Sequence, residues 1–223
     1  MKNAKVQLPG SHGLTEETSI ALRSARVVPL VTPIDVQTTV TMAKALARGG
    51  IRVIEIALRS APALDSIAAV KQAVPELLVA AGTVTNPGEL QKVFDAGAEL
   101  AFSPGWSETL LEASAQRQLA LVPGVSTASD VMACTHRGFN ILKLFPAETV
   151  GGRSLLRALA GPFPQAAFCP TGGINQDNLG KYLALDNVLC CGGSWLVSDA
   201  HRPDCDWDAL SDIAASLMRE VDA

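Results

Sequence analysis

The sequence lacks the features of a secreted, membrane-bound or nucleic-acid-binding protein. Its 223 residues contain no apolar run that approaches the length of a membrane span. Lys2 and Lys5 are not followed by the apolar segment of a secretory signal peptide. The 18 basic residues are outnumbered by 22 acidic ones, and nothing suggests the clustered basic face that nucleic-acid binding needs. We therefore expect neither a membrane nor a nucleic-acid partner.

The cysteines do not form a disulfide framework or a metal-binding pattern. They are five in number, and none of them forms a C-x-x-C pair. We expect reduced thiols of a cytoplasmic protein that fill buried positions as small apolar side chains do, and we expect no bound metal. They are Cys134, Cys169, Cys190, Cys191 and Cys205. The three histidines, His12, His136 and His201, fall in a predicted arm, helix and loop, and none is assigned a catalytic role.

Short apolar runs alternate with helical patterns along almost the whole chain. Eight runs are expected to be strands, at 27–31, 53–58, 77–81, 100–102, 119–122, 141–145, 166–170 and 188–191. They are continuously apolar, as parallel strands buried on both faces are. Eight strand–helix units in about two hundred residues predict an α/β protein with a single (β/α)8 TIM barrel. The rival architecture is a doubly wound open sheet, but no G-x-G-x-x-G follows the first strand.

Capping residues mark where several helices begin and end. Asp35 precedes a helical pattern over 36–48 that stops at Gly49, and Asn175 precedes another. Ser60 is expected to cap the helix after the second strand.

The chain shows no linker, low-complexity stretch or charge block that would divide it. Its length suits one domain that buries a full core without disulfides or metals. We expect residues 1–13 to form a flexible N-terminal arm and residues 14–223 to form the single barrel domain. Residues 14–24 predict an N-terminal helix that covers the bottom of the barrel.

A lysine interrupts the sixth predicted strand. Alternation along Ile141-Leu142-Lys143-Leu144-Phe145 puts Ile141, Lys143 and Phe145 on one face and the two leucines on the other. If the leucines pack against helices, Lys143 points into the barrel near the end of the strand where active sites lie. A buried amine that can exist uncharged is the nucleophile that imine chemistry needs. The alternative is a side chain that reaches solvent.

A carboxylate interrupts the second predicted strand. The apolar side chains of Ile54, Ile56 and Leu58 form a stripe for the helices, so Glu55 and Arg59 face the barrel interior and its mouth. A carboxylate there, with a lysine on another strand, is an acid–base arrangement. Alternatively, Glu55 and Arg59 simply neutralise each other.

Glycine-rich turns follow the seventh and eighth predicted strands, at 171–173 and 192–194. In barrels this is the usual position of a phosphate site, because glycine lets backbone N–H groups approach an anion. Each turn alone also fits a tight bend. The two together favour phosphate.

These segments together resemble the 2-keto-3-deoxy-6-phosphogluconate (KDPG) aldolase family. The resemblance covers about Ala25 to Val197 and rests on the motifs G-G-I-R-V-I-E-I-A-L-R-S, A-G-T-V-T-N-P, F-S-P-G, L-K-L-F-P-A-E, C-P-T-G-G-I and G-G-S-W-L-V. It implies a class I (Schiff-base) aldolase of the Entner–Doudoroff pathway that cleaves the phosphorylated keto acid to pyruvate and glyceraldehyde 3-phosphate. It also implies cleavage of 4-hydroxy-2-oxoglutarate to pyruvate and glyoxylate, a homotrimer and no cofactor.

The resemblance implies roles for the matched residues. Lys143 matches the Schiff-base lysine, and Glu55 matches the general acid–base. Arg59 and Thr83 match residues that hold the pyruvate carboxylate. Leu144 stands where some members have an aromatic residue, and this difference removes no functional group.

The remaining matches concern substrate specificity. Pro104 and Phe145 match apolar walls around the pyruvyl part, and Thr171 matches a position tied to stereochemistry at C4. The phosphate pocket is matched by Gly172, Gly173, Gly193 and Ser194. The related 2-keto-3-deoxy-6-phosphogalactonate aldolase tends to have an apolar residue at the position of Thr171, so this residue favours the gluconate substrate. Three alternatives remain. The first is the phosphogalactonate aldolase, the second is a phosphate-binding barrel isomerase or epimerase, and the third is a non-catalytic binding protein.

Overall fold

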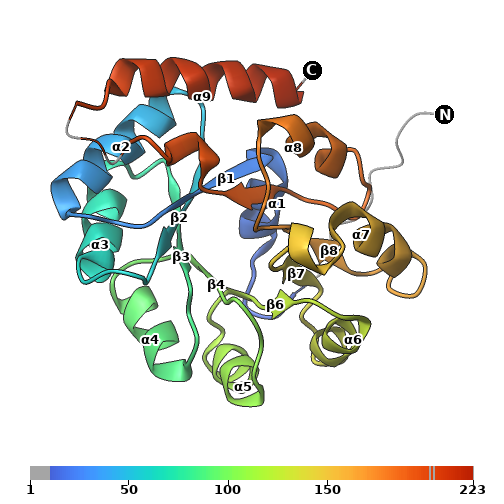
Figure 1. The fold of residues 1–223 in the computed structure, drawn as a ribbon. Coiled ribbons are helices and arrows are strands. Elements are labelled where there is room, and N and C mark those ends of the chain that lie inside the picture. The colour runs from blue at the N-terminus through green and yellow to red at the C-terminus, as the bar shows by residue number, and fades with distance from the viewer. Residues whose placement is uncertain (1–10, 201, 203, 223) are drawn as a thin grey trace.

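The computed structural model describes residues 11–200, 202 and 204–222, which fold as parallel strands surrounded by helices (Figure 1). The strands are β1 (Val27–Val31), β2 (Val53–Ala57), β3 (Leu78–Gly82), β4 (Leu100–Phe102), β5 (Leu121–Val122), β6 (Gly124–Val125), β7 (Ile141–Leu144), β8 (Ala167–Phe168) and β9 (Cys191–Gly193). The α-helices are α1 (Glu16–Ala25), α2 (Val36–Arg48), α3 (Ala63–Ala73), α4 (Pro87–Asp95), α5 (Glu108–Arg117), α6 (Ala128–His136), α7 (Gly152–Ala160), α8 (Gln176–Leu183) and α9 (Trp207–Asp222). Two short 3-10 helices are η1 (Glu148–Val150) and η2 (Trp195–Val197). No helix in these described ranges is long and apolar enough to cross a membrane.

The strands form a curled parallel sheet of six and a smaller parallel sheet of three. Their orders are β5-β4-β3-β2-β1-β9 and β6-β7-β8. Only Pro123 separates β5 from β6, and proline has no N–H to continue a ladder. Its carbonyl nevertheless accepts the N–H of Lys143 at 2.9 Å. On the other side, an isolated parallel bridge joins Thr171 to Gly192 in β9. The fold is therefore of the α/β class, with a curled parallel sheet of six strands and a smaller one of three.

Side-chain alternation separates two apolar clusters, as the sequence pattern predicts. Leu142 and Leu144 of β7 belong to the outer cluster, which packs the strands against the helices. Ile141 belongs to a separate inner cluster, which also contains Phe102 and Cys190. The interior face of β7 is therefore the face that carries Lys143.

Local capping signals are confirmed at two helices and wrong at a third. Asp35 accepts the N–H of Thr38 at 2.7 Å and caps α2, while Asn175 forms a capping box on α8. The Ser60 hydroxyl instead donates to the carbonyl of Pro33 at 2.6 Å, and α3 begins after Pro62 without a side-chain cap. The Ser60 side chain therefore ties two loops together and does not cap a helix.

Residues 11–13 and α1 lie at the end of the sheets that is opposite the strands' carboxyl ends. Residues 1–10 of the predicted arm, and His201, lie outside the described residues. Ser11 is buried, and its hydroxyl accepts the backbone N–H of Asn140 at 3.2 Å. The predicted N-terminal helix is present as α1, and its Leu22 and Ala25 join the inner apolar cluster. This helix covers the amino-terminal side of the strands.

Candidate active site

The centre of the candidate site is a buried ion pair between β7 and β2. The ammonium nitrogen of Lys143 donates to Oε1 of Glu55 at 2.8 Å and to Oε2 at 3.1 Å. Lys143 is 3% exposed and Glu55 1% exposed, so neither charge is solvated. The alternative that Lys143 reaches solvent is therefore wrong. Two residues 88 positions apart in the chain form the acid–base arrangement that the sequence predicts.

Apolar rings surround this ion pair. The ring centroids of Phe102 and Phe145 lie 5.1 Å and 5.7 Å from the Lys143 nitrogen, within the range of cation–π attraction. In such a setting, moving one proton from the ammonium to the carboxylate produces two neutral groups and a nucleophilic amine. Phe102 was missed by sequence reasoning, although the alternation of Leu100, Ala101 and Phe102 would have placed its ring on the interior side.

Gly82 makes space for the carboxylate. A Cβ atom at this position of β3 would lie 2.8 Å from both Cγ and Cδ of Glu55, closer than real Cβ contacts allow. Gly82 was not singled out in the sequence, because nothing in its neighbourhood reveals which side chain lies beside it. The absence of a side chain at Gly82 therefore leaves space for the carboxylate of Glu55 beside Lys143.

Interior thiols lie near the pair. The Sγ atoms of Cys169 and Cys190 are 3.4 Å apart, and both side chains are buried. The hydrogen bond with Cys169 and burial raise the pKa of Cys190 well above its ordinary value, and the charge of Glu55 adds to the rise. The thiol of Cys190 is therefore a protonated packing group. Four of the five cysteines are buried, as expected, whereas Cys205 is partly exposed.

Arg59 and Thr83 lie together at the carboxyl ends of β2 and β3. The Arg59 Nε–H donates to the Thr83 hydroxyl at 3.1 Å. Thr83 has φ of 62°, a left-handed conformation that is uncommon for a threonine and that clusters at functional sites. Because Glu55 pairs with Lys143, the alternative that Glu55 and Arg59 neutralise each other is wrong. The exposed guanidinium of Arg59 is available for a carboxylate.

Pro104 and Phe145 line a common cavity of about 210 Å³ beside the ends of β4 and β6. Its outer wall is the indole of Trp106, whose Nε1–H donates to Asp130 at 3.0 Å. Burial opposes ionisation of Asp130, but hydrogen bonds from Trp106 and from the backbone and side chains at the start of α6 lower the pKa of this carboxyl. The cavity therefore combines the rings of Pro104 and Phe145 with polar groups, among them Ser126 and Asp130.

The two glycine-rich turns are neighbours. The parallel bridge between Thr171 and Gly192 places residues 172–173 beside residues 193–194 at the carboxyl edge of the strands. Gly172 and Gly173 have φ of 99° and 83°, which glycine adopts without strain. Thr171 is buried and Ser194 is exposed at the start of η2, so the first points towards the interior and the second towards solvent.

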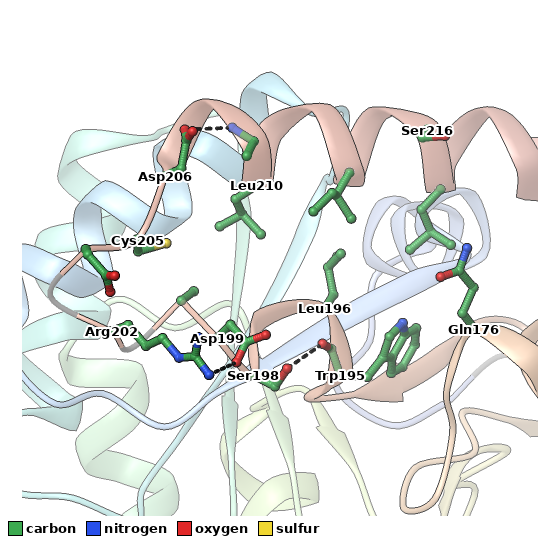
Figure 2. A pocket seen from close by; sticks show the side chains of 15 residues that line it. Gln176, Trp195, Leu196, Ser198, Asp199, Arg202, Cys205, Asp206, Leu210 and Ser216 are labelled. Carbon is green, nitrogen blue, oxygen red and sulfur yellow. Dashed lines mark hydrogen bonds and ion pairs between the residues drawn. The ribbon is translucent and has the colours of Figure 1, made fainter.

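A larger cavity, of about 560 Å³, lies elsewhere, between η2 and α9 (Figure 2). None of the candidate site residues lines it. Three of its polar side chains have protein partners: Asp199 pairs with Arg202 at 3.3 Å, and Asp206 accepts two N–H groups of α9. The buried Lys143–Glu55 pair lies outside this larger cavity. Within the described residues, no group of three His, Cys, Asp or Glu side chains could hold a metal ion.

Comparisons with known proteins agree with this geometry. Residues 18–213 match the family model described as KDPG and KHG aldolase. The KHG/KDPG aldolase of Escherichia coli (strain K12) is 47% identical over 197 residues, which are 88% of this chain and 92% of that protein.

Solved structures of the family are also similar. The KDPG aldolase of Legionella pneumophila, solved with pyruvate captured at low pH as a covalent carbinolamine intermediate, has a TM-score of 0.85 and 37% identity over 88% of this chain and 96% of that one. The 2-keto-3-deoxy-6-phosphogluconate aldolase of Zymomonas mobilis ZM4, solved with 3-phosphoglycerate, has a TM-score of 0.82 and 38% identity over 89% and 94% of the two chains. With the buried Lys143–Glu55 pair and these similarities together, the chain belongs to the KDPG and KHG aldolase family and is an aldolase.

Proposed function

We propose that this enzyme cleaves 2-dehydro-3-deoxy-6-phosphogluconate to pyruvate and glyceraldehyde 3-phosphate through a Schiff base on Lys143. We also propose that it cleaves 4-hydroxy-2-oxoglutarate to pyruvate and glyoxylate. The observation that carries the proposal is the Lys143–Glu55 pair, which puts an amine and a proton acceptor 2.8 Å apart in an apolar interior. The substrate names of the relatives and the carbinolamine captured in the Legionella enzyme support it.

The reaction follows from what each group can do. Glu55 takes a proton from Lys143, and the free amine attacks the C2 ketone to form a carbinolamine. Glu55 then returns a proton so that water leaves and a protonated imine forms. The iminium accepts the electron pair of the C3–C4 bond as the C4 hydroxyl loses its proton and the aldehyde departs. The resulting enamine is protonated at C3, and water releases pyruvate and restores the amine.

The other residues serve binding in this proposal. Arg59 and Thr83 hold the pyruvate carboxylate, and Pro104 and Phe145 enclose its apolar part. Thr171, on the interior side, contacts the C4 substituent. The phosphate is bound at the far side of the opening by Gly172, Gly173, Gly193 and Ser194. The proximity of the two turns supports this arrangement.

Three further features belong to the proposal. We infer that the two sheets close into one eight-stranded barrel, with β5 and β6 as a single strand interrupted at Pro123 and the Thr171–Gly192 bridge on the other side.

We propose a homotrimer, which light scattering tests, since Ile34 and Met132 among others expose large apolar side chains. A cytoplasmic location is the third, and cell fractionation tests it.

Covalent trapping tests the nucleophile. Incubation with pyruvate and borohydride should inactivate the enzyme and add one pyruvyl-derived mass per chain at Lys143, because reduction makes the imine permanent. The Lys143→Met variant, which keeps a long apolar chain, is the control and should take up no label. A label on Lys71 or Lys181 in the native enzyme would refute the assignment.

Substrate choice separates the alternatives. A barrel isomerase or epimerase has no need of an amine at Lys143 and would not be trapped by pyruvate. Steady-state comparison of the gluconate, galactonate and hydroxyoxoglutarate substrates distinguishes the two aldolase specificities. We expect the phosphogluconate substrate to have the highest kcat/KM, because Thr171 is polar at the position that governs C4 stereochemistry.

A further inference from the structure

The segment after β7 orients the glycine turn at 171–173. The N–H of Ala147 donates to the carbonyl of Thr171 at 2.8 Å, and the N–H of Glu148 donates to the carbonyl of Gly172 at 3.0 Å. A trans peptide unit directs its carbonyl and its N–H in opposite directions. The N–H groups of Gly172 and Gly173, which share peptide units with these two carbonyls, therefore both point away from this segment.

Helix α8 fixes the next peptide unit in the same way. Asn178 Nδ2 donates to the carbonyl of Gly173 at 3.0 Å. The N–H of Ile174 belongs to the same peptide unit and therefore points away from Asn178. The parallel bridge between Thr171 and Gly192 engages the N–H of Gly172. Among the residues that the structure describes, the N–H groups of Gly173 and Ile174 have no hydrogen-bond acceptor. The turn thus presents two consecutive free donors, as anion-binding concavities of backbone N–H groups do.

Glu148 is itself anchored by Tyr182 of α8. The Tyr182 hydroxyl donates a hydrogen bond to Oε1 of Glu148, and the tyrosine ring is completely buried. Two glycines leave space for this contact. A Cβ atom on Gly173 would lie 2.6 Å from Cγ of Glu148, and one on Gly152 would lie 2.9 Å from its Oε1. The surroundings of Glu148 therefore hold it in one position.

We propose that Glu148 and Tyr182 are positioning residues for the phosphate of the substrate, an inference that rests on the proposed function. Neither residue touches the substrate. Tyr182 fixes Glu148, whose backbone N–H fixes the Gly172 carbonyl and so directs the Gly173 N–H towards the anion. Donors held in the binding orientation avoid the cost of ordering them when the ligand arrives. Loss of the contact weakens phosphate binding and leaves the chemistry at Lys143 unchanged.

The test uses Tyr182→Phe and Glu148→Ala in the full chain. For each variant, kcat and KM are measured with the phosphogluconate substrate and with 4-hydroxy-2-oxoglutarate, and inorganic phosphate is tested as a competitive inhibitor. We expect KM for the phosphorylated substrate and Ki for phosphate to rise roughly threefold to tenfold, the range of one lost hydrogen bond. The phosphate-free reaction should change by less than about twofold in kcat/KM on the same scale.

Two controls separate positioning from general damage. Glu148→Gln keeps an oxygen acceptor for Tyr182 and should stay near the native values. Ser114→Ala also removes a buried hydroxyl, which donates to the Leu119 carbonyl at 2.6 Å far from the turns, and should change neither reaction. If Tyr182→Phe does not fold, Glu148→Ala, at an exposed position, decides alone.

The outcomes distinguish this inference from the proposed function. Equal losses on both substrates, or no loss on either, overturn the positioning role. If Ser194→Ala weakens only the phosphorylated substrate while Tyr182→Phe and Glu148→Ala do not, the phosphate pocket stands and the inference is wrong. If Ser194→Ala is also without effect and phosphate does not inhibit the native enzyme, the proposed phosphate pocket fails as well.

Discussion

At the scale of the residue, the chemistry depends on a charge pair that the interior cannot solvate. Removing one partner of a buried ion pair leaves an unpaired charge, which typically costs about 3–5 kcal/mol. The same proximity of Lys143 and Glu55 also lets a proton pass directly between them, because donor and acceptor are 2.8 Å apart. In the proposed reaction, the nucleophile and its acid–base partner are therefore in direct contact.

Replacing the carboxylate should remove proton transfer while leaving the shape of the site. Glu55→Gln is expected to lower kcat by roughly a hundredfold or more on both the phosphorylated and the phosphate-free substrate, in line with typical general acid–base contributions. The measurement is kcat and KM for each substrate, with thermal unfolding as a check that the variant is folded. A decrease below about tenfold would mean that another group moves the protons.

At the scale of the element, strand ends and helix starts place the binding groups. Thr171 and Gly192 bridge neighbouring strands, so the residues that follow them share one edge. The start of α6 supports the opposite side of the opening, where Asp130 accepts hydrogen bonds from Trp106 and from the N–H groups of Ser126 and Thr127. Strands thus contribute residues at their carboxyl ends, and α6 contributes residues at its amino-terminal end.

The turn after β9 should contribute binding and no chemistry. Ser194→Ala removes one hydrogen bond to a charged group, worth about 1.5–3 kcal/mol. If this bond forms equally in the ground and transition states, the loss raises KM for the phosphorylated substrate and spares kcat. 4-Hydroxy-2-oxoglutarate has no phosphate and should react nearly as before. Equal slowing of both substrates would place the phosphate elsewhere.

The capping box of α6 should make stability depend on pH. Because the pKa of Asp130 is lowered in the folded protein, its contribution is complete above the ordinary value of 3.8 and is lost as pH falls through the folded value. Asp130→Asn should therefore be less stable than the native protein at neutral pH, and the difference should shrink below about pH 4. Urea unfolding of both proteins at several pH values measures it. A difference that grows in acid contradicts the prediction.

At the scale of the molecule, parallel strands direct all their carboxyl ends to one side. The carboxyl ends of β2, β3, β4, β7 and β9 therefore lie on one side of the fold, while α1 covers the opposite end (Figure 1). Such an architecture lets residues from distant parts of the chain share one reaction centre.

The whole enzyme should work without a divalent metal ion. In the proposed reaction the iminium accepts the electron pair of the breaking bond, so no Lewis acid is required. Exhaustive dialysis against EDTA is expected to leave kcat unchanged, with metal content verified by mass spectrometry. Loss of activity that Mg²⁺ or Mn²⁺ restores would exclude the Schiff-base mechanism.

Periodicity and capping predict much of this molecule without the structure. Alternation on the strands at 53–58 and 141–145 correctly assigns the interior faces, since the side-chain period of a strand is two whatever its neighbours. Asp35 and Asn175 mark helix starts, because capping involves residues close in sequence. Ser60 shows the limit of such local signals, since its partner, Pro33, is 27 positions away.

The contacts that complete the site were decided by the tertiary structure. Sequence alone identified Lys143 and Glu55 as interior groups, but their direct contact depends on how β2 and β7 lie across the interior. The space beside Gly82, the ring of Phe102 and the anchor from Tyr182 to Glu148 likewise join residues far apart in the chain. A local pattern determines which face a side chain occupies, because backbone geometry repeats along the chain. Which other side chain it contacts is determined by the packing of elements that are far apart in the sequence.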